Sequence, residues 1–259
     1  MTAAFFQPDG DRFVPSELTR GPWDPEAQHA GPPSALIGRA IERCGDPDGG
    51  QIGRVTFEIL RPVPLKPLTA EAKVVRPGRS VELIEASLSG PEGEVIRARA
   101  WRLRTRPVEL DPAPVPEPPA HGPGDGEPGG FFDTGVDVGY HTAVDYQFVE
   151  GSFVEPGPAL VWMRMRQPLV EGEEPSPLQR VLTVADSGNG VSGALDYRRF
   201  LFINTDLSVH LHRMPEGEWV CLEARTFPEP NGVGLADTAL YDERGRIGRA
   251  AQTLLVRAR

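Results

Sequence analysis

The chain has 259 residues, with 27 Lys and Arg against 37 Asp and Glu, and a formal net charge of −10 at pH 7. The length suits two units of about 110 to 130 residues, each large enough to bury a core. The negative charge argues against a nucleic-acid partner, because no long-range field would attract a polyanion. The two cysteines form no metal or disulfide pattern, and neither a basic leader nor a long apolar run occurs. We therefore expect a cytoplasmic protein that is neither exported nor membrane-spanning.

In the first half, Phe13 and Trp23 mark the opening strands, and a helix is predicted after Pro32 and Pro33. Alternating apolar residues then predict four long strands, with turn sequences between them, at residues 55–59, 68–75, 81–88 and 95–103. Residues 106–130 are so rich in proline and glycine that they predict an extended linker, which hardly buries apolar surface or forms a strand ladder.

The second half repeats this order of elements. Strand signals at residues 143–148 and 160–165 open it, a helix follows Ser176 and Pro177, and four strands follow Asn204. We therefore divide the chain into an N-terminal unit of residues 1–105, the linker of residues 106–130 and a C-terminal unit of residues 131–259.

An internal repeat supports this division. Residues 55–104, shifted by 152 positions, coincide without a gap with residues 207–256. Roughly three or four identities are expected from average residue usage, whereas the identical pairs are Arg61/Arg213, Glu71/Glu223, Ala72/Ala224, Val81/Val233, Leu83/Leu235, Leu88/Leu240, Gly93/Gly245, Arg97/Arg249, Ala98/Ala250 and Leu103/Leu255. One supersecondary unit is used twice. One helix and a mostly antiparallel sheet per unit predict an α+β fold in which two curved sheets join edge to edge and cover both helices.

Several segments resemble the acyl-CoA thioesterase II family: residues 21–33, 59–62, 76–80, 185–186, 204–213 and 249–255. The resemblance implies a double hot-dog, in which two tandem hot-dog units each have a curved antiparallel sheet wrapped around one central helix. It also implies hydrolysis of fatty acyl-CoA thioesters by a water molecule that an Asp, a hydroxyl residue and a Gln position and activate. Asp186 and Gln252 fall on the family's aspartate and glutamine. The hydroxyl position falls on Asn204, with Thr205 beside it, and an amide cannot replace the donor and acceptor roles of a single hydroxyl oxygen.

The repeat points to the same three residues, because each has an apolar counterpart in the first copy: Asp186 opposite Ile41, Asn204 opposite Ile52 and Gln252 opposite Ala100. Three polar groups in a place that the first copy fills with aliphatic carbon require hydrogen-bonding partners such as water or substrate. We predict Asp186 as a general base, since a helix C-terminus and burial both raise its proton affinity. The amide N–H groups of Asn204 and Gln252 would orient water or a carbonyl.

Other interpretations of these residues stay open. Residues 186–190 can be a helix-ending turn, and the two amides can satisfy backbone at strand edges. His29 and Gly31 are predicted substrate-binding residues, because N–H groups at the start of the first helix can polarise a carbonyl. Thr205, the hydroxyl residue next to Asn204, is also predicted to bind substrate. The alternative is that His29 caps a loop and that Gly31 makes room for the proline after it.

No metal site is predicted, since His210 and His212 lack a third ligand at suitable spacing, and no cofactor is implied. Arg61, Arg79 and Arg213 can meet the phosphates of coenzyme A or form a solvated surface.

These observations predict an acyl-CoA thioesterase that binds acyl-CoA but neither nucleic acid nor membrane, and that forms a homo-oligomer, a dimer or tetramer of the double unit. The alternatives are a non-catalytic acyl-CoA-binding protein on the same fold and another hot-dog acyl-thioester enzyme, a hydratase or dehydratase.

Overall fold

The computed structural model describes residues 3–46, 50–112, 115, 118–131 and 134–259. Within these residues the α-helices are α1 (Gly31–Arg43), α2 (Tyr140–Ala143), α3 (Pro177–Ala185) and α4 (Gly188–Val191), and short 3-10 helices lie at Glu17–Thr19 and Pro123–Asp125. The strands are β1 (Phe6–Asp9), β2 (Arg12–Pro15), β3 (Gln51–Ile59), β4 (Thr69–Arg76), β5 (Val81–Gly90), β6 (Gly93–Leu103), β7 (Glu127–Pro128), β8 (Val144–Glu150), β9 (Ala159–Met165), β10 (Phe200–Asn204), β11 (Asp206–Leu211), β12 (Val220–Pro228), β13 (Val233–Asp242) and β14 (Gly245–Ala258).

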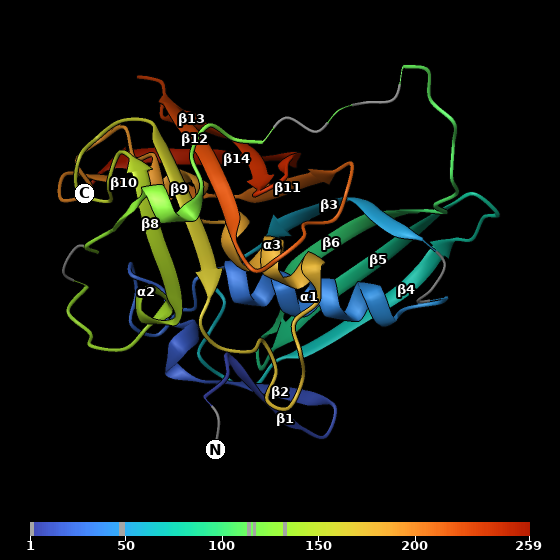
Figure 1. The fold of residues 1–259 in the computed structure, drawn as a ribbon. Coiled ribbons are helices and arrows are strands. Elements are labelled where there is room, and N and C mark those ends of the chain that lie inside the picture. Colours follow the sequence, from blue (N-terminus) through green and yellow to red (C-terminus); the bar gives the residue numbers. More distant parts are fainter. Residues whose placement is uncertain (1–2, 47–49, 113–114, 116–117, 132–133) are drawn as a thin grey trace.

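A large antiparallel sheet dominates the described part of the chain (Figure 1). The neighbouring strands follow the order β4-β5-β6-β3-β11-β14-β13-β12-β9-β8-β7, and β10 also pairs with β14. The order β4-β5-β6-β3 in the first copy is repeated as β12-β13-β14-β11 in the second, and the copies meet where β3 pairs with β11. At this junction Thr56 lies opposite Ser208, which is its own equivalent under the shift of 152 positions.

The repeated strand run that the sequence predicts is confirmed. Shifting the bounds of β5 by 152 positions gives those of β13, and β6 and β14 begin at the equivalent Gly93 and Gly245. Both glycines have positive φ angles, 105° and 139°, which residues with a side chain rarely adopt. The same turn chemistry therefore starts the last strand of each copy.

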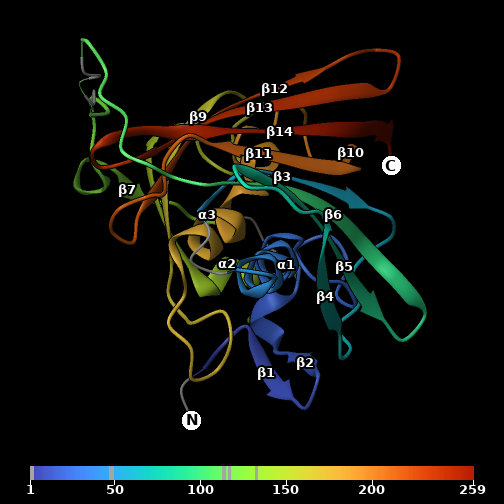
Figure 2. The same ribbon diagram turned by 90° about the vertical axis from the view of Figure 1, so that its right-hand side faces the viewer.

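Both predicted helices lie on the concave side of the sheet and pack against each other (Figure 2). α1 begins with Gly31, Pro32 and Pro33, where prolines lose no helical hydrogen bond. The side chain of Ser176 caps α3 by accepting a hydrogen bond of 3.2 Å from the N–H of Gln179.

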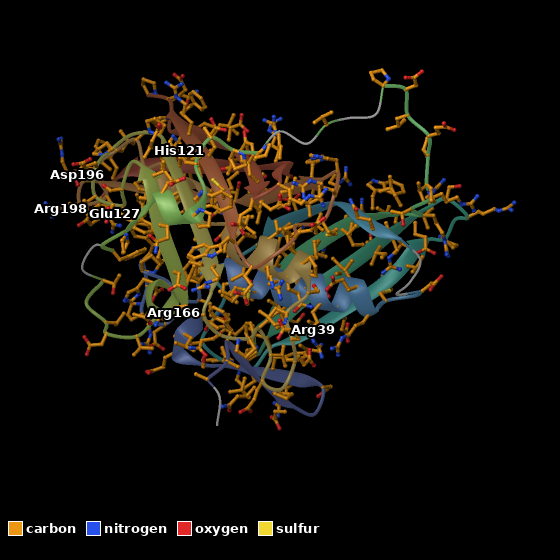
Figure 3. The ribbon with its side chains drawn as sticks, viewed as in Figure 1. Arg39, His121, Glu127, Arg166, Asp196 and Arg198 are labelled. Atoms are coloured by element: carbon orange, nitrogen blue, oxygen red, sulfur yellow. The ribbon has the colours of Figure 1, made fainter. Side chains whose placement is uncertain are left out.

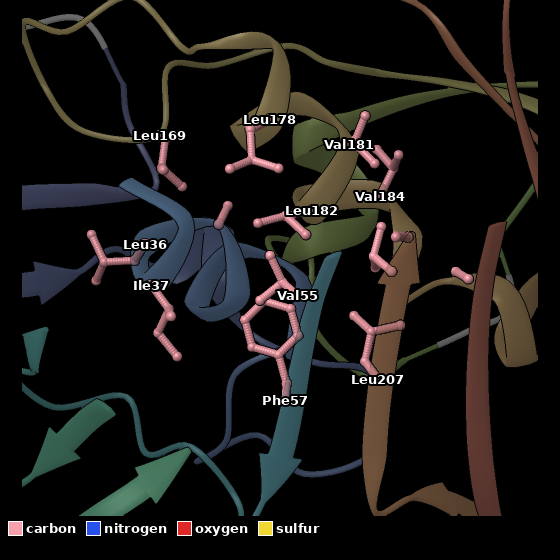
Figure 4. Close-up of a cluster of buried hydrophobic side chains, with 14 of the residues drawn as sticks. Leu36, Ile37, Val55, Phe57, Leu169, Leu178, Val181, Leu182, Val184 and Leu207 are labelled. Atoms are coloured by element: carbon pink, nitrogen blue, oxygen red, sulfur yellow. The ribbon is translucent and has the colours of Figure 1, made fainter. Parts of the chain in front are cut away.

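The core lies between the two helices and the strands at the junction of the copies (Figure 4). Leu36 and Ile37 of α1 and Leu182 of α3 are fully buried, as are Phe57 of β3 and Leu207 of β11. Burial of such side chains stabilises the fold by about 1.5–3 kcal/mol each. The core holds α1 and α3 in a fixed relation to the sheet junction.

The start of the first unit agrees with the prediction at Phe13 and differs at Trp23. Phe13 lies in a strand, β2, which pairs with β1 in a two-stranded sheet, whereas Trp23 lies in a bend. Pro22 and Pro25 flank this tryptophan, and proline cannot donate to a strand ladder. Trp23 therefore forms no strand, whereas Phe13 exchanges main-chain hydrogen bonds with Leu68, the residue before β4.

The predicted linker is also more ordered at its end than the composition suggests. Residues 113–114 and 116–117 lie outside the described residues, but β7 pairs with β8 as an edge strand. The indole N–H of Trp162 donates to the main-chain oxygen of His121 at 3.1 Å and so anchors the segment to β9.

None of the helices in the described ranges is long and apolar enough to cross a membrane.

Candidate active site

A buried carboxylate lies at the C-terminal end of α3. Asp186 directly follows the helix and is 5% exposed. The carbonyl groups at this end of a helix disfavour a nearby anion, and burial removes the water that would stabilise it. Neighbouring hydrogen-bond donors must therefore hold the carboxylate.

Two side-chain amides supply such donors. Nδ2 of Asn204 donates to Oδ1 of Asp186 at 2.8 Å, and Nε2 of Gln252 donates to the same oxygen at 3.2 Å. Nε2 of Gln252 also donates to the main-chain oxygen of Asp186 at 3.0 Å, while its Oε1 accepts from the N–H of Asn189 at 3.1 Å. The second N–H of Asn204 donates to the main-chain oxygen of Asp206 at 3.3 Å. The structure thus brings the three predicted residues together, with the amide N–H groups directed at protein oxygens.

This arrangement differs from the expected one, in which the amides would face water or substrate. All four amide N–H bonds are occupied, and the contact of Gln252 with the N–H of Asn189 fixes which end of the amide faces Asp186. The two side chains therefore position the carboxylate. Asn204, at the end of β10, is the one of the two amides that also lines the cavity described below.

Burial raises the pKa of Asp186 to about 7, and the hydrogen bonds from Asn204, Gln252 and the N–H of Ala30 oppose this rise. A carboxylate with this proton affinity is ionised in a large fraction of molecules at neutral pH. It also binds a proton more strongly than an ordinary aspartate. These are the properties of a general base that works near pH 7.

His29 stands beside this carboxylate, with Nδ1 3.4 Å from Oδ2 of Asp186. Burial lowers the pKa of His29 to about 3, so the pair is not an ion pair at neutral pH. Nδ1 accepts a hydrogen bond of 3.0 Å from the N–H of Gly31, which assigns the ring proton to Nε2. The ring stacks on Tyr140, with centroids 3.8 Å apart and planes at 8°. His29 is therefore neutral and fixed, with its acceptor Nδ1 next to Asp186 and its ring proton on Nε2.

The start of α1 meets the same carboxylate. The N–H of Ala30 donates to Asp186, and the N–H of Gly31 donates to His29. The next two residues are prolines without an N–H group. The free N–H groups that we expected at this helix start are thus occupied or absent, and its positive end faces Asp186.

Gly31 instead has a steric role, which gives a first prediction. A Cβ at this position would overlap the main-chain oxygen of Thr183 in α3, so Gly31→Ala must push the two helices apart. We expect a loss of about 2 kcal/mol or more in the free energy of unfolding, measured by urea denaturation, and a fall in activity.

Gly38→Ala in the same helix is the matched control. The one close contact of its Cβ would be Cδ1 of Leu182, at 2.5 Å, which is the end of a flexible side chain. Alanine also favours a helix interior over glycine by about 1 kcal/mol. Equal destabilisation by the two variants would contradict the role assigned to Gly31.

A cavity of about 420 Å³ opens next to Asp186. Its walls are mainly apolar and aromatic, which suits an acyl group, and include Trp23, Ile59, Val63, Phe131, Tyr140, Tyr146, Phe153, Leu201, Phe202 and Ile203. Asp186, Asn204 and His29 line it, as does Thr205, whereas Gly31 and Gln252 lie behind them. The hydroxyl of Thr205 is 3.4 Å from Oδ1 of Asp206. The sequence-predicted substrate residues His29 and Thr205 thus reach the cavity.

Tyr140 is a residue of the site that gave no signal in the sequence. The hydroxyl of Tyr140 donates to the main-chain oxygen of Thr183 at 2.9 Å and lies 3.1 Å from Oγ of Ser187, so it fixes the ring on which His29 stacks. Tyr140 stands ten residues after the linker in a segment without periodicity, and only the tertiary fold brings it to the helix end. Asn189 lies within the turn at residues 186–190 that the sequence did single out.

In the first copy the equivalent position is filled by apolar side chains and an arginine. Ile41, Ile52 and Ala100, the counterparts of the three polar residues, are at most 4% exposed. Arg102, itself 2% exposed, covers the C-terminal end of α1 and donates to the main-chain oxygens of Ile41 at 2.7 Å and Cys44 at 2.8 Å. A cation at the helix end is stabilising there, where the second copy has an anion.

Comparison with protein-family models places these features in a known family. The model of the acyl-CoA thioesterase N-terminal domain matches residues 19–103, and that of the acyl-CoA thioesterase C-terminal domain matches residues 107–256. The chain belongs to the acyl-CoA thioesterase family. This confirms the family to which the sequence motifs pointed, and the thioesterase class of enzyme. A comparison with curated protein sequences gives no match.

Solved structures agree in fold. A conserved protein of unknown function with hot dog fold from Alicyclobacillus acidocaldarius superposes with a TM-score of 0.74 at 15% identity, over 98% of this chain and 96% of that one. The tesB protein of Mycobacterium avium subspecies paratuberculosis superposes with a TM-score of 0.66 at 16% identity, over 97% of this chain and 95% of that one. Acyl-CoA thioesterase II TesB2 from Mycobacterium marinum superposes with a TM-score of 0.64 at 15% identity, over 98% of this chain and 94% of that one. At these identities the likeness establishes the hot-dog fold.

Proposed function

We propose that this acyl-CoA thioesterase family member hydrolyses acyl-CoA to a free acid and coenzyme A with a water molecule that Asp186 activates. The observation that carries the proposal is a buried carboxylate with a pKa of about 7, held by two amides at the wall of an apolar cavity. A general base needs this proton affinity and a fixed position within reach of its water molecule.

In the proposed reaction a water molecule between Asp186 and the thioester transfers a proton to the carboxylate. The oxygen of this water molecule bonds to the carbonyl carbon, and the carbon–sulfur bond then breaks. The proton passes from Asp186 to the leaving sulfur. Oδ1 of Asp186 already accepts two amide hydrogen bonds, so we assign the proton to Oδ2. Asn204 and Gln252 act as positioning residues, because their N–H groups hold the base in place.

We assign stabilisation of the thioester oxygen to His29. Its ring is neutral, its Nδ1 is occupied by the N–H of Gly31, and its remaining N–H is therefore the group available to donate. A neutral imidazole can polarise a carbonyl without giving up its proton. Thr205, at the cavity wall, contacts bound substrate in this proposal, and Gly31 contributes by keeping His29 close to Asp186.

We also propose that the chain is a tandem double hot-dog with units at residues 1–105 and 131–259 and a linker at residues 106–130. The repeated strand order supports this, as does the pairing of Thr56 with its own equivalent Ser208, since a twofold relation between copies requires such a pair. A dimer or tetramer of the double unit stays a prediction, which light scattering can check.

The pH dependence of the rate follows from the same carboxylate. Because the ionised form is the active base, kcat/KM should be highest above about pH 7 and fall about tenfold per pH unit well below the pKa of about 7. Initial rates between pH 5 and 9 with one acyl-CoA measure this profile. A profile that stays flat through this range would exclude Asp186 as the base.

Release of thiol from a panel of acyl-CoAs, measured with a thiol reagent on the purified full chain, tests the proposed function. Release at a rate proportional to enzyme concentration supports it. Tight binding of acyl-CoA without thiol release would refute hydrolysis and favour the non-catalytic binding protein. Addition of water to an enoyl-CoA without thiol release would favour the hydratase.

A further inference from the structure

Strand β10 connects the candidate active site to a turn rich in arginine. At one end Asn204 contacts Asp186, and at the other end Arg198 and Arg199 immediately precede the strand. Five residues at the rise of a β-strand place Arg199 roughly 16 Å from Asn204. The intervening residues Leu201, Phe202 and Ile203 all line the cavity. A ligand that extends from Asp186 along this strand arrives at the arginine turn.

We call Arg198 and Arg199, together with Arg257 of the neighbouring β14, the arginine turn. All three are exposed, and none of them is in an ion pair within the described residues (Figure 3 labels Arg198). β14 brings Arg257 opposite Leu201 of β10. In the same chain other exposed arginines do have acidic partners, as in the pair of Arg97 with Glu94 at 2.6 Å. Three unpaired cations at one end of a protein with a net charge of −10 form a local site for an anion.

The turn is also held in place. The N–H of Arg259 donates to the main-chain oxygen of Arg199 at 3.0 Å, and its Nε donates to that of Tyr197 at 2.9 Å. The guanidinium of Arg198 lies 5.5 Å from the ring centroid of Tyr197. Of the neighbouring acids, Asp196 accepts from the N–H of Arg198 at 2.9 Å. These contacts fix the direction of the turn and leave the guanidinium groups exposed.

A second cavity of about 270 Å³ adjoins the turn. Tyr197 and Arg198 line it, together with the acids Asp196 and Glu155. It shares Trp23, Phe153 and Phe202 with the main cavity, so the two hollows meet at the same side chains. The shared residues therefore link the cavity at Asp186 to the one that Arg198 lines, whereas Arg199 and Arg257 lie outside both linings.

We propose that the arginine turn binds the phosphates of the nucleotide end of coenzyme A, with the pantetheine arm lying along β10. The identity of the ligand rests on the proposed function. The extended pantetheine arm separates the thioester from the phosphates by a distance of the order that β10 spans, and arginine is the side chain best suited to phosphate.

This site differs from the three arginines that the sequence suggested. Arg213 forms a bidentate contact with Asp242 and also donates to the main-chain oxygen of Gly245 at 2.8 Å. Arg79 follows β4, the edge strand on the far side of the molecule from β10 (Figure 1). Arg61 lines the main cavity and donates to the main-chain oxygen of Glu92 at 3.3 Å, and it serves as the competing candidate.

The test compares an acyl-CoA with the acyl-pantetheine of the same acyl group, which lacks the nucleotide. For the double variant Arg198→Ala/Arg199→Ala, and separately for Arg257→Ala, we expect kcat/KM with acyl-CoA to fall about tenfold or more through KM, since each contact to a charged group contributes on this scale. The rate with acyl-pantetheine should not change. Arg79→Ala is the matched control and should change neither rate.

Two outcomes would overturn the site: an equal effect of the variants on both substrates, or an acyl-CoA-specific effect confined to Arg61→Ala. Calorimetry with adenosine 3′,5′-bisphosphate tests the site without turnover, and we expect binding to the wild type that the double variant loses at least tenfold. If neither thioester is hydrolysed, the proposed function fails, and this titration alone decides whether the arginine turn binds the nucleotide.

Discussion

Asp186→Asn is expected to reduce kcat/KM for acyl-CoA hydrolysis by about 10²- to 10⁴-fold, the range that general-base catalysis contributes. Asparagine has nearly the same shape, and its Oδ1 can still accept the hydrogen bonds that Asn204 and Gln252 give to Oδ1 of the aspartate. It cannot take a proton from water. The loss should therefore appear in kcat, with little change in KM, because the proton moves only as the reaction proceeds.

Asp237→Asn is the matched control for this variant. Asp237 lies in β13 and pairs with Arg249 at 2.8 Å, and the aspartate side chain of this pair is 42% exposed. The same chemical change at this exposed position should leave thiol release within about twofold of the wild type, in line with the small contribution of exposed ion pairs. Unchanged turnover by Asp186→Asn would refute the assignment of the base.

The repeat and the strand pattern were predictable because they depend on local sequence. Alternation of apolar residues defines a strand face, and a glycine with positive φ at positions 93 and 245 marks the same turn in both copies. The grouping of the three candidate residues was predictable because the first copy served as a reference: Asp186 replaces a buried isoleucine and Gln252 a buried alanine. A change from carbon to polar atoms at equivalent buried positions is visible in a single sequence.

The partners of the site were not predictable, because they come from distant segments. His29 reaches Asp186 from the start of α1, and Tyr140 reaches His29 from α2. Which atoms of an amide face a carboxylate also depends on the competing acceptors, here the main-chain oxygens of Asp186 and Asp206. The sequence could place amides near the aspartate, but it could not show that their N–H groups hold it.

The two fold predictions that were wrong also rested on local sequence alone. Proline and glycine predicted that residues 106–130 would form no ladder, but β7 needs only two residues to pair with the exposed edge of β8. Trp23 suggested a strand from its side chain alone, and the prolines around it prevent one. Edge pairing depends on which strand has a free edge, and this is a property of the assembled sheet.

Asp186→Asn is also expected to stabilise the protein at alkaline pH. Burial raises the pKa of Asp186 from 3.8 to about 7, so between these values the folded chain binds the proton more tightly than the unfolded chain. The folded wild type therefore loses stability as pH rises through this window, and the loss is complete above about pH 7. The difference between the two pKa values corresponds to a loss of about 4 kcal/mol in the free energy of unfolding. Urea denaturation should show a gain of this order for Asp186→Asn at pH 8 and almost none at pH 4.

Asp242 provides a control of opposite sign. It is completely buried, and burial alone would raise its pKa, but hydrogen bonds from Arg213 and from the N–H groups of Glu216 and Arg244 lower it overall. The contribution of Asp242 to stability is therefore present above the pKa that this carboxyl group has in the unfolded chain, and it is lost as pH falls. Asp242→Asn should destabilise the protein at pH 8 by about 3 kcal/mol, because Arg213 would lose its charged partner.

The contrast between these two buried aspartates distinguishes a structural carboxylate from the one that we propose as the base. Asp242 faces a guanidinium, which keeps it ionised and unable to accept a proton from water near neutral pH. Asp186 faces only neutral donors, from Asn204, Gln252 and Ala30, which hold its position without cancelling its charge. The instability of an unpaired buried anion is then the source of its basicity. A loss of stability in Asp186→Asn at pH 8 would show that this carboxylate is a structural group after all.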